Sequence, residues 1–429
     1  MSTRKTEQRS RVRALLSTGI ALGLGGACVA GFATSTPAIA GTVLKIAENG
    51  TQPGLSNVIS RYEKLHPGVQ ISVTSVPSNT YQPTVRTELT GGNGPDLMFV
   101  WGGDGNSMSV GQLAATKDVA PLNGAPWIRE MPTSEKKLFE VKGAVDGMSI
   151  DYNVGAFYYN EQVFKKAKLR IPKTFNQLLG ACTALRKIGV TPIDLGNQVA
   201  YLDFQIPVIF ADDIVYSEDP QFGAQLASGK TTLARSSIWH KAVLEGDKEY
   251  AALFSHHCVE PNSTATTDTE AIAAVASGKA GMTTLLANFQ ELRQDNPHGR
   301  FGSFEAPALN TPGKVVVTID PGLAFAVNSH SPNKAAAKQF IAYLAEPSVI
   351  AYLSALSDSI PNVVPKGFTV PGIFNGLKPL INHGKLAEYP TNYFTNYQTK
   401  LTWEAETEDI ATGTASPAAA TRAVLKTLG

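Results

Sequence analysis

The segment from residue 143 to residue 196 constrains the fold more than any other part of the chain. It contains a strand-like stretch followed by Asn160, a good N-cap for a short helix. A proline turn comes next, and Thr174 followed three residues later by Gln177 predicts a capping box at the start of a second helix. Apolar residues then recur at helical spacing until Gly189, where we expect the helix to stop. The segment therefore predicts a strand followed by two helices.

The same alternation occurs nearer the N-terminus. We expect a strand at 42–47, an amphipathic helix at 55–65, an alternating strand at 69–73 and a fully apolar strand at 97–100. Strands that alternate with helices imply an α/β sheet. About 390 residues follow the first 40, which is too long for a single hydrophobic core and predicts two domains.

Several of these motifs, in this order, resemble the family 1 extracellular solute-binding proteins, the sugar-binding group that includes maltose-binding protein. That family has a tyrosine and asparagine before a short helix, then a proline-lysine-threonine-aromatic entry to the next. Similar segments here are Tyr159-Asn160, Pro172-Lys173-Thr174-Phe175, Gly94-Pro95-Asp96, Ser277-Gly278-Lys279-Ala280 and the helix that begins near Ser331-Pro332-Asn333. The resemblance covers nearly the whole chain after residue 40.

The resemblance implies a two-domain periplasmic-binding-protein-like fold with a ligand cleft between the lobes. Lobe 1 would comprise residues 41–150 and 305–350, and lobe 2 would comprise residues 151–304 and 351–429. Hinge strands would lie within 143–150 and 301–311.

Residues 1–40 have the pattern of a signal peptide. Basic residues between Arg4 and Arg13 precede a stretch rich in Gly, Ala and other apolar residues, and Ala38-Ile39-Ala40 fits a cleavage site. A membrane anchor is the alternative, because the apolar stretch is long enough to span. Cys28 is either a lipid attachment site or a small apolar residue of the signal core. We expect an exported protein that is extracellular or attached to the outer face of the plasma membrane.

Charge and cysteine content limit the classes of function. The chain has 37 basic and 36 acidic residues, and removal of residues 1–40 leaves a small negative net charge, which gives no indication of nucleic-acid binding. Cys182 and Cys258 either form a disulfide or remain as two buried thiols. His256-His257-Cys258 lacks a second Cys/His pair at zinc spacing, and Asp212-Asp213 is interpreted as a solvated turn. We predict neither a metal site nor a cofactor.

Ligands of open α/β sheets bind beyond the carboxyl ends of strands, and this rule selects the candidate site. Carboxylates and amides at such positions bind hydroxyl groups, and an aromatic ring packs against the apolar face of a pyranose. The predicted ligand-binding residues are Glu48, Asn49, Trp101, Gly102, Asp104, Asp151, Asn153, Asn197, Trp239, Asn288, Phe289, Asp320 and Gly322.

Some of these residues have structural alternatives. Trp101 either stacks on a sugar or caps the edge of the sheet. Glu48 and Asp151 either form hydrogen bonds to the ligand or serve as loop caps or salt-bridge partners. Trp239 lies where the family often has aromatic residues in the cleft. Phe289 stands near the place where many relatives have a stacking tryptophan, which is a departure from their pattern.

The resemblance implies a monomeric solute-binding protein without enzymatic activity. It would capture a mono- or oligosaccharide by hinge closure and deliver it to the permease subunits of an ABC importer. Two alternatives stay open: the same fold with a non-sugar solute, and a secreted carbohydrate hydrolase. A hydrolase needs two carboxylates at a defined separation, and no motif selects such a pair.

Overall fold

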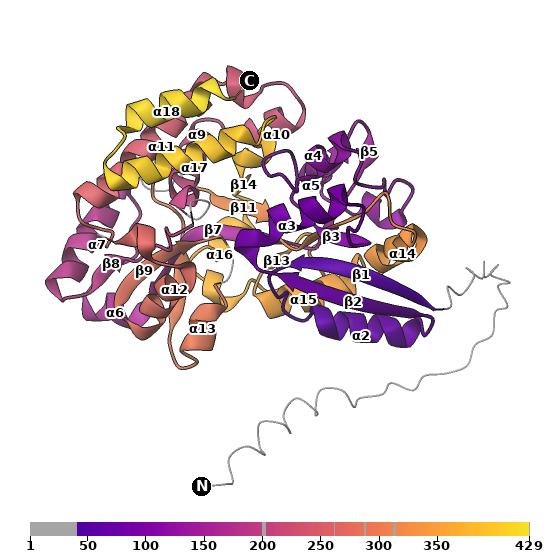
Figure 1. The fold of residues 1–429 in the computed structure, drawn as a ribbon. Helices are drawn as coiled ribbons and strands as arrows, with labels where there is room; N and C mark the ends of the chain where they lie inside the picture. Colours follow the sequence, from indigo (N-terminus) through magenta and orange to yellow (C-terminus); the bar gives the residue numbers. More distant parts are fainter. Residues whose placement is uncertain (1–40, 200–202, 261, 287–288, 312–314, 429) are drawn as a thin grey trace, which may run out of the picture. The chain divides into compact units, whose positions relative to one another are not determined.

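A computed structural model describes residues 41–199, 203–260, 262–286, 289–311 and 315–428. The predicted signal peptide with Cys28, and Asn288, lie outside these ranges. The described chain forms two mixed β-sheets, each packed against helices over hydrophobic cores of its own (Figure 1). We call these two parts the first lobe and the second lobe.

The first lobe contains a five-stranded sheet in the order β2-β1-β3-β12-β6. β1 pairs in parallel with β2 and β3, whereas β12 pairs antiparallel with β3 and β6. Its strands are β1 (Thr42–Asn49), β2 (Val69–Val76), β3 (Leu97–Phe99), β6 (Met148–Ser149) and β12 (Ala324–Val327). Its helices include α2 (Leu55–Leu65), α3 (Ser78–Thr90), α4 (Val110–Ala115), α5 (Thr133–Leu138), α14 (Lys334–Leu344) and α15 (Pro347–Ser357). A short hairpin joins β4 (Glu140–Val141) to β5 (Ala144–Val145).

The second lobe is organised around β7 (Asp151–Asn160), which pairs antiparallel with four other strands. The sheet order is β14-β11-β7-β9-β8, and β10 and β13 also pair with β7. The other strands are β8 (Thr191–Ile193), β9 (Ala280–Leu285), β10 (Phe301–Phe304), β11 (Val317–Pro321), β13 (Ile360–Pro361) and β14 (Leu386–Glu388).

Helices of the second lobe pack on this sheet and on one another. They are α6 (Glu161–Lys166), α7 (Phe175–Lys187), α9 (Gln205–Glu218), α10 (Phe222–Ala227), α11 (Ser237–Ser255), α12 (Asp268–Ser277), α13 (Glu291–Asp295), α16 (Lys378–Asn382), α17 (Gln398–Thr412) and α18 (Pro417–Lys426). Nearly all side chains of α9 are buried, because α11 covers it on one side and the sheet on another.

The predicted helix starts agree with the structure. The side chain of Asn160 accepts hydrogen bonds from the backbone N–H groups of Gln162 and Val163 and caps α6. The hydroxyl of Thr174 accepts the N–H of Gln177, 3.2 Å away, and caps α7. In a full capping box the Gln177 side chain would also accept the backbone N–H of Thr174. Here it accepts the N–H of the preceding residue, Lys173. α7 ends at Lys187, two residues before Gly189.

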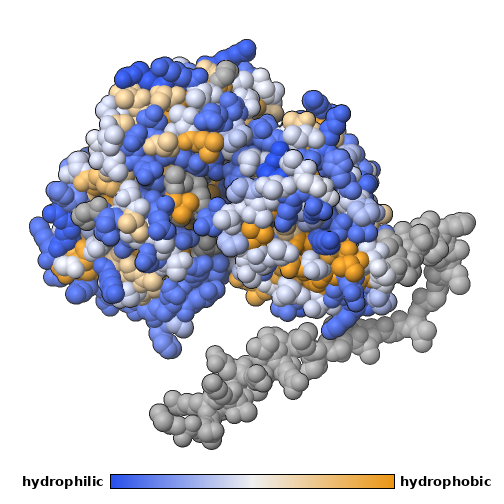
Figure 2. All heavy atoms as spheres, in the orientation of Figure 1, coloured by the Kyte–Doolittle hydropathy of each residue, from blue (hydrophilic) through white to orange (hydrophobic). Residues whose placement is uncertain are grey.

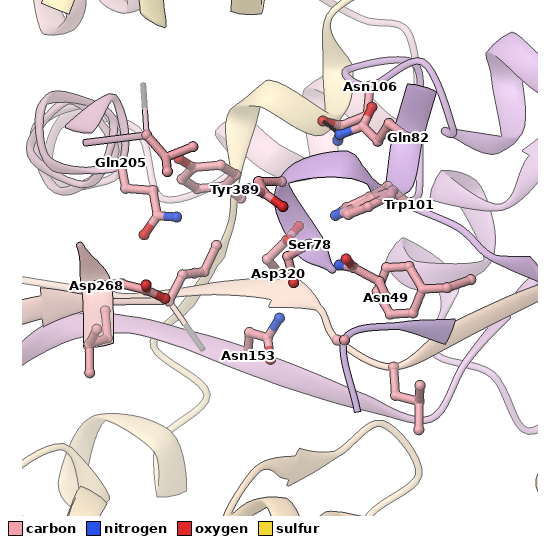
Figure 3. A pocket seen from close by; sticks show the side chains of 18 of the residues that line it. Asn49, Ser78, Gln82, Trp101, Asn106, Asn153, Gln205, Asp268, Asp320 and Tyr389 are labelled. Carbon is pink, nitrogen blue, oxygen red and sulfur yellow. Dashed lines mark hydrogen bonds between the residues drawn. The ribbon is translucent and has the colours of Figure 1, made fainter. Parts of the chain in front are cut away.

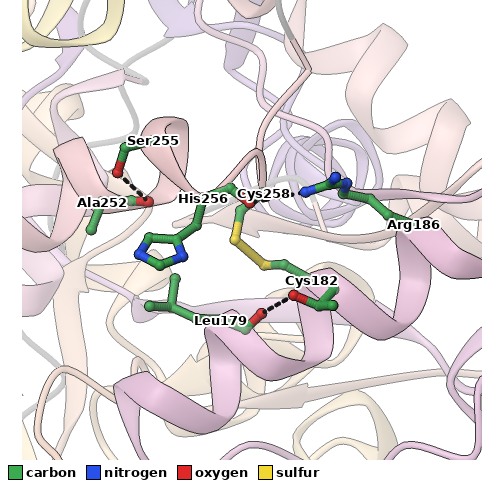
Figure 4. Close-up of a disulfide and its surroundings, with 8 residues drawn as sticks. Leu179, Cys182, Arg186, Ala252, Ser255, His256 and Cys258 are labelled. Carbon is green, nitrogen blue, oxygen red and sulfur yellow. Dashed lines mark hydrogen bonds between the residues drawn. A yellow bond between two sulfur atoms is a disulfide. The ribbon is translucent and has the colours of Figure 1, made fainter.

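A disulfide joins Cys182 of α7 to Cys258 beyond the end of α11 (Figure 4). The two Cα atoms are 5.1 Å apart, and 76 positions separate the residues in sequence. Both side chains are fully buried in the core of the second lobe. This pairing resolves the alternative that the sequence left open, and it makes the Cys258 sulfur unavailable as a metal ligand.

Three expectations from the sequence differ from the structure. The boundary expected at residue 351 would place most of α15 in the second lobe, but Leu353 of this helix packs in the core of the first lobe. The boundary expected at residue 305 would place 317–321 in the first lobe, but these residues form β11 and pair with β7 in the second sheet. Asp212 and Asp213 do not form a solvated turn, because both lie inside the buried helix α9. A side-chain oxygen of Asp212 accepts the hydroxyl of Thr318 at 2.6 Å, and burial raises the pKa of both carboxyls.

Candidate functional site

A cavity of about 1010 Å³ lies between the two lobes and collects residues from the ends of several elements. In Figure 3, Trp101 and Asn49 of the first lobe lie on one side of this space, and Gln205 and Asp268 of the second lobe lie on the other. The face of the molecule shown in Figure 2 is largely hydrophilic, with apolar patches on both lobes. The cavity is therefore bounded by both lobes, so a ligand within it would contact each of them.

The predicted strand-end residues meet at this cavity from both sheets. Asn49 ends β1, Asn153 belongs to β7, and Asp320 belongs to β11. Trp101 follows β3 and is partly exposed, with its ring centroid 4.8 Å from that of Phe99 at a steep angle. The predicted residues that line the cavity are Asn49, Trp101, Asp151, Asn153, Phe289, Asp320 and Gly322.

Two predicted carboxylates are used inside the protein. Glu48 does not line the cavity, because its carboxylate accepts the hydroxyl of Ser75 and the N–H of Gln52. Asp151 lines the cavity, but its oxygens accept the N–H of Leu323 at 2.8 Å and the hydroxyl of Ser359. These contacts agree with the loop-cap interpretation of both residues.

Four other predicted residues do not line the cavity. Trp239 is fully buried in the core of the second lobe and stacks on Phe222, so its assignment to the cleft is wrong. Asn197 is also buried and donates to the hydroxyl of Tyr250. Gly102 and Asp104 belong to the loop after β3, but only other residues of that loop, such as Trp101 and Gly105, line the cavity.

Phe289 lines the cavity, yet its ring is used in the protein core. It is 2% exposed and stacks on Tyr158, with 5.4 Å between ring centroids and an interplanar angle of 5°. Because little of the ring is accessible, Phe289 does not replace the stacking tryptophan expected from the resemblance. Trp101 is the indole that lines the cavity among the described residues.

Sequence reasoning missed a group of polar residues in the same wall. Most of them lie on helices or near the C-terminus, where the strand-end rule gives no signal. Tyr389 does follow a strand, but β14 is too short to stand out in the sequence. The missed residues that line the cavity include Ser78, Gln82, Asn106, Gln205, Asp268, Tyr389, Asn392, Lys400 and Glu404.

Two polar atoms at the cavity have no hydrogen-bond partner among the described residues. They are the side-chain oxygen of Asn49 and the hydroxyl of Tyr389. Tyr389 is only 5% exposed, and burial raises its pKa well above the ordinary value, so the hydroxyl is neutral. A buried polar group without a partner costs free energy, and a ligand hydroxyl placed here would remove that cost.

The charged residues at the cavity are mostly acidic. Asp151, Asp268, Glu291, Asp320 and Glu404 line it, and Lys400 is the one cation among the described lining residues. The ammonium group of Lys400 is 3.5 Å from a carboxylate oxygen of Glu404. An anionic ligand would thus meet no free cation here, whereas a neutral polyhydroxy ligand would find both donors and acceptors.

A two-lobed α/β fold with a polar cleft between the lobes defines the class of hinged ligand-binding proteins. The chain belongs to the bacterial extracellular solute-binding protein family, whose model matches residues 48–351.

Two curated relatives and one solved structure show what this chain is similar to. The melibiose/raffinose/stachyose-binding protein MelE of Bacillus subtilis is 21% identical over 317 residues, which is 70% of each chain. The multiple sugar-binding protein of Streptococcus mutans is 20% identical over 143 residues, and the match spans 33% of that relative's length. A sugar transporter protein of Bacillus licheniformis, solved in complex with stachyose, superposes with a TM-score of 0.70 at 15% identity. That superposition covers 90% of this chain and 98% of the other and supports the same fold.

Proposed function

We propose that this protein captures a neutral oligosaccharide between its two lobes and delivers it to an ABC importer. The observation that carries the proposal is a cavity that both lobes line with polar side chains, among them Asn49 and Tyr389, each of which has a buried polar atom without a partner among the described residues. A ligand with several hydroxyls would find hydrogen-bond donors and acceptors on both sides of this cavity. Closure around the ligand then follows, since contacts with both lobes favour the closed form over the open one.

The size of the cavity favours an oligosaccharide over a monosaccharide. Its volume of about 1010 Å³ is at the upper end of the range of about 300–1,000 Å³ found for small-molecule sites. The named relatives bind melibiose, raffinose and stachyose, which agrees with this size. Trp101 would stack on one sugar ring while amides and carboxylates bind the hydroxyls.

Lys400 is the one cation that lines the cavity in the described part of the chain, and it is held by Asn106 and Glu404, which argues for a neutral ligand. The further parts of the proposal are export through residues 1–40, a monomeric state, and return of the ligand unchanged.

Whether Cys28 receives a lipid is tested by metabolic labelling of the expressed protein with a radioactive fatty acid, with a Cys28→Ser variant as control.

A ligand panel tests the function. The purified protein is mixed with mono-, di-, tri- and tetrasaccharides, with uronic acids, and with amino acids, and its thermal stability and tryptophan fluorescence are measured. We expect a saturable stabilisation by one class of neutral oligosaccharide, since a ligand that binds only the folded state raises its stability. Stabilisation by an amino acid or a uronic acid instead would contradict the sugar assignment, and cleavage of the bound oligosaccharide would contradict the binding role.

A further inference from the structure

The two lobes contact each other directly at the cavity, through residues that line it. The ammonium group of Lys400, on α17 of the second lobe, donates to the side-chain oxygen of Asn106 in the loop after β3 of the first lobe. Gln82 of α3 donates to the same oxygen at 3.4 Å. Lys400 also lies 3.5 Å from Glu404, one turn further along its own helix. We call Lys400, Asn106 and Gln82 the interlobe clasp.

A pair of glycines lets the two lobes approach closely beside the clasp. Gly103 and Gly105 of the first lobe lie against the backbone carbonyls of Asn392 and Thr391 in the second lobe. A Cβ atom at position 105 would be 2.6 Å from the Thr391 oxygen, a separation that side chains essentially never adopt. A larger residue at either position would therefore push residues 391–392 away and lengthen the distance from Lys400 to Asn106.

The clasp and the glycine pair join protein atoms to protein atoms, so they form without any ligand. Each contact exists only when the lobes are close together, because its two sides belong to different lobes: Trp403 of α17 packs in the core of the second lobe, and Phe99 of β3 packs in the core of the first. A contact made in one state of a two-state equilibrium raises the population of that state. The apparent affinity of a ligand rises in proportion to the fraction of protein that is already competent to bind it.

We propose that Lys400 is a positioning residue that holds the two lobes together across the cleft before the ligand binds, with Gly103 and Gly105 making room for the contact. This proposal rests on ligand capture by hinge closure as described above. Lys400 thus sets the affinity of the site through the open-to-closed equilibrium. Its ammonium group is occupied by Asn106 and Glu404 and acts on the protein, while hydroxyls of the ligand are bound by other residues.

The test compares two variants that weaken the contact with two matched controls. Lys400→Met removes the charge but keeps the length of the side chain, and Gly105→Ala adds one methyl group that points at Thr391. Lys248→Met removes an exposed lysine of α11 that pairs with Glu245, and Gly180→Ala adds a methyl group in α7, where nothing lies within 4 Å. The radius of gyration of each protein is measured by small-angle X-ray scattering without sugar and with the best sugar of the panel.

We expect Lys400→Met and Gly105→Ala to enlarge the sugar-free protein and to weaken sugar binding by roughly five- to tenfold through the smaller closed fraction. At saturating sugar both variants should return to the wild-type size, and both controls should match the wild type throughout. The double variant Lys400→Met/Asn106→Leu should be no weaker than the single Lys400→Met variant, because both changes break the same bond.

Two results would overturn the proposal. One is a sugar-free size that is unchanged in Lys400→Met and Gly105→Ala. The other is weaker binding in Lys400→Met with full affinity in Gly105→Ala, which would mean that Lys400 contacts the ligand directly. The sugar-free scattering data need no ligand, so they test the clasp even if the sugar assignment fails.

Discussion

The side-chain amide of Asn392 donates to a carboxylate oxygen of Asp320, with 2.7 Å between the two atoms. The backbone carbonyl of the same residue lies close against Gly103 of the opposite lobe. Asp320 is 5% exposed and lines the cavity at the end of β11. Asn392 therefore links Asp320, a residue of the cavity, to the contact between the lobes.

Asp320 should make stability depend on pH. Burial raises its pKa from 3.8 to about 6, against the opposing effect of the Asn392 hydrogen bond. Between these two values the folded protein holds a proton that the unfolded chain has lost, so the free energy of unfolding falls as pH rises through this window. For a group this deeply buried the total loss is about 3 kcal/mol, at about 1.4 kcal/mol for each unit of pKa shift.

Asp320→Asn isolates this effect, because the variant cannot ionise at position 320. Urea unfolding of both proteins is measured at pH 4, 5, 6 and 7. The variant should gain stability relative to the wild type as pH rises from 4 to 7. A stability difference that stays constant over this range would show that Asp320 does not titrate there.

Tyr389→Phe should change stability and binding in opposite directions. The hydroxyl has no partner among the described residues, so its removal should raise the stability of the sugar-free protein by about 1 kcal/mol. Sugar affinity should fall by about tenfold, since a hydrogen bond to the ligand is lost. Calorimetry gives both quantities, by thermal unfolding and by titration. Full affinity in the variant would remove Tyr389 from the site.

Trp101→Ala should weaken binding by roughly 10- to 100-fold while the protein stays folded, as for other large aromatic residues at the centre of a binding site. Titration calorimetry and circular dichroism provide the measurements. Trp127→Ala is the matched control, because Trp127 packs partly buried against the same core but does not line the cavity. We expect that control to lose stability and to keep its affinity. If Trp101→Ala lost stability but kept its affinity, Trp101 would be assigned to the edge of the sheet instead.

Reduction of the disulfide should lower stability without altering the site. A bridge between residues 76 positions apart restricts the unfolded chain, and loops of this length correspond to about 4 kcal/mol. The double variant Cys182→Ala/Cys258→Ala should unfold at lower urea concentration and bind sugar as the wild type does. The bridge lies in the core of the second lobe, and neither cysteine lines the cavity. A change in affinity would reveal coupling between that core and the cleft.

Local signals explain what could be predicted from the sequence. The caps at Asn160 and Thr174 act within three residues, and the strand that precedes Trp101 is apolar throughout, so each could be recognised without knowledge of the rest of the chain. The strand-end rule also predicted Asn49 and Asp320 as site residues, because the ends of their strands can be recognised locally, and both residues line the cavity.

Long-range packing explains what could not be predicted. The residues next to Trp239 and Trp101 in the sequence do not reveal their positions, because only the tertiary structure buries the first against Phe222 and leaves the second at the cavity. The sequence around Asp212 and Asp213 predicts a turn, but the two residues lie in α9, which is enclosed by α11 and the sheet. Gln205 and Lys400 reach the site from helices whose position depends on residues far away in sequence.

The strand order determines how late during translation each sheet can complete its pairing. β12, at 324–327, lies between β3 and β6, and β7 pairs with both β11, at 317–321, and β13, at 360–361. Neither sheet can reach its final pairing until the ribosome has synthesised more than three hundred residues. Contacts this distant in sequence make folding slow, and neither sheet is complete while most of the chain is being translated. A chain in that condition is suited to passage through a narrow membrane channel before it folds on the far side.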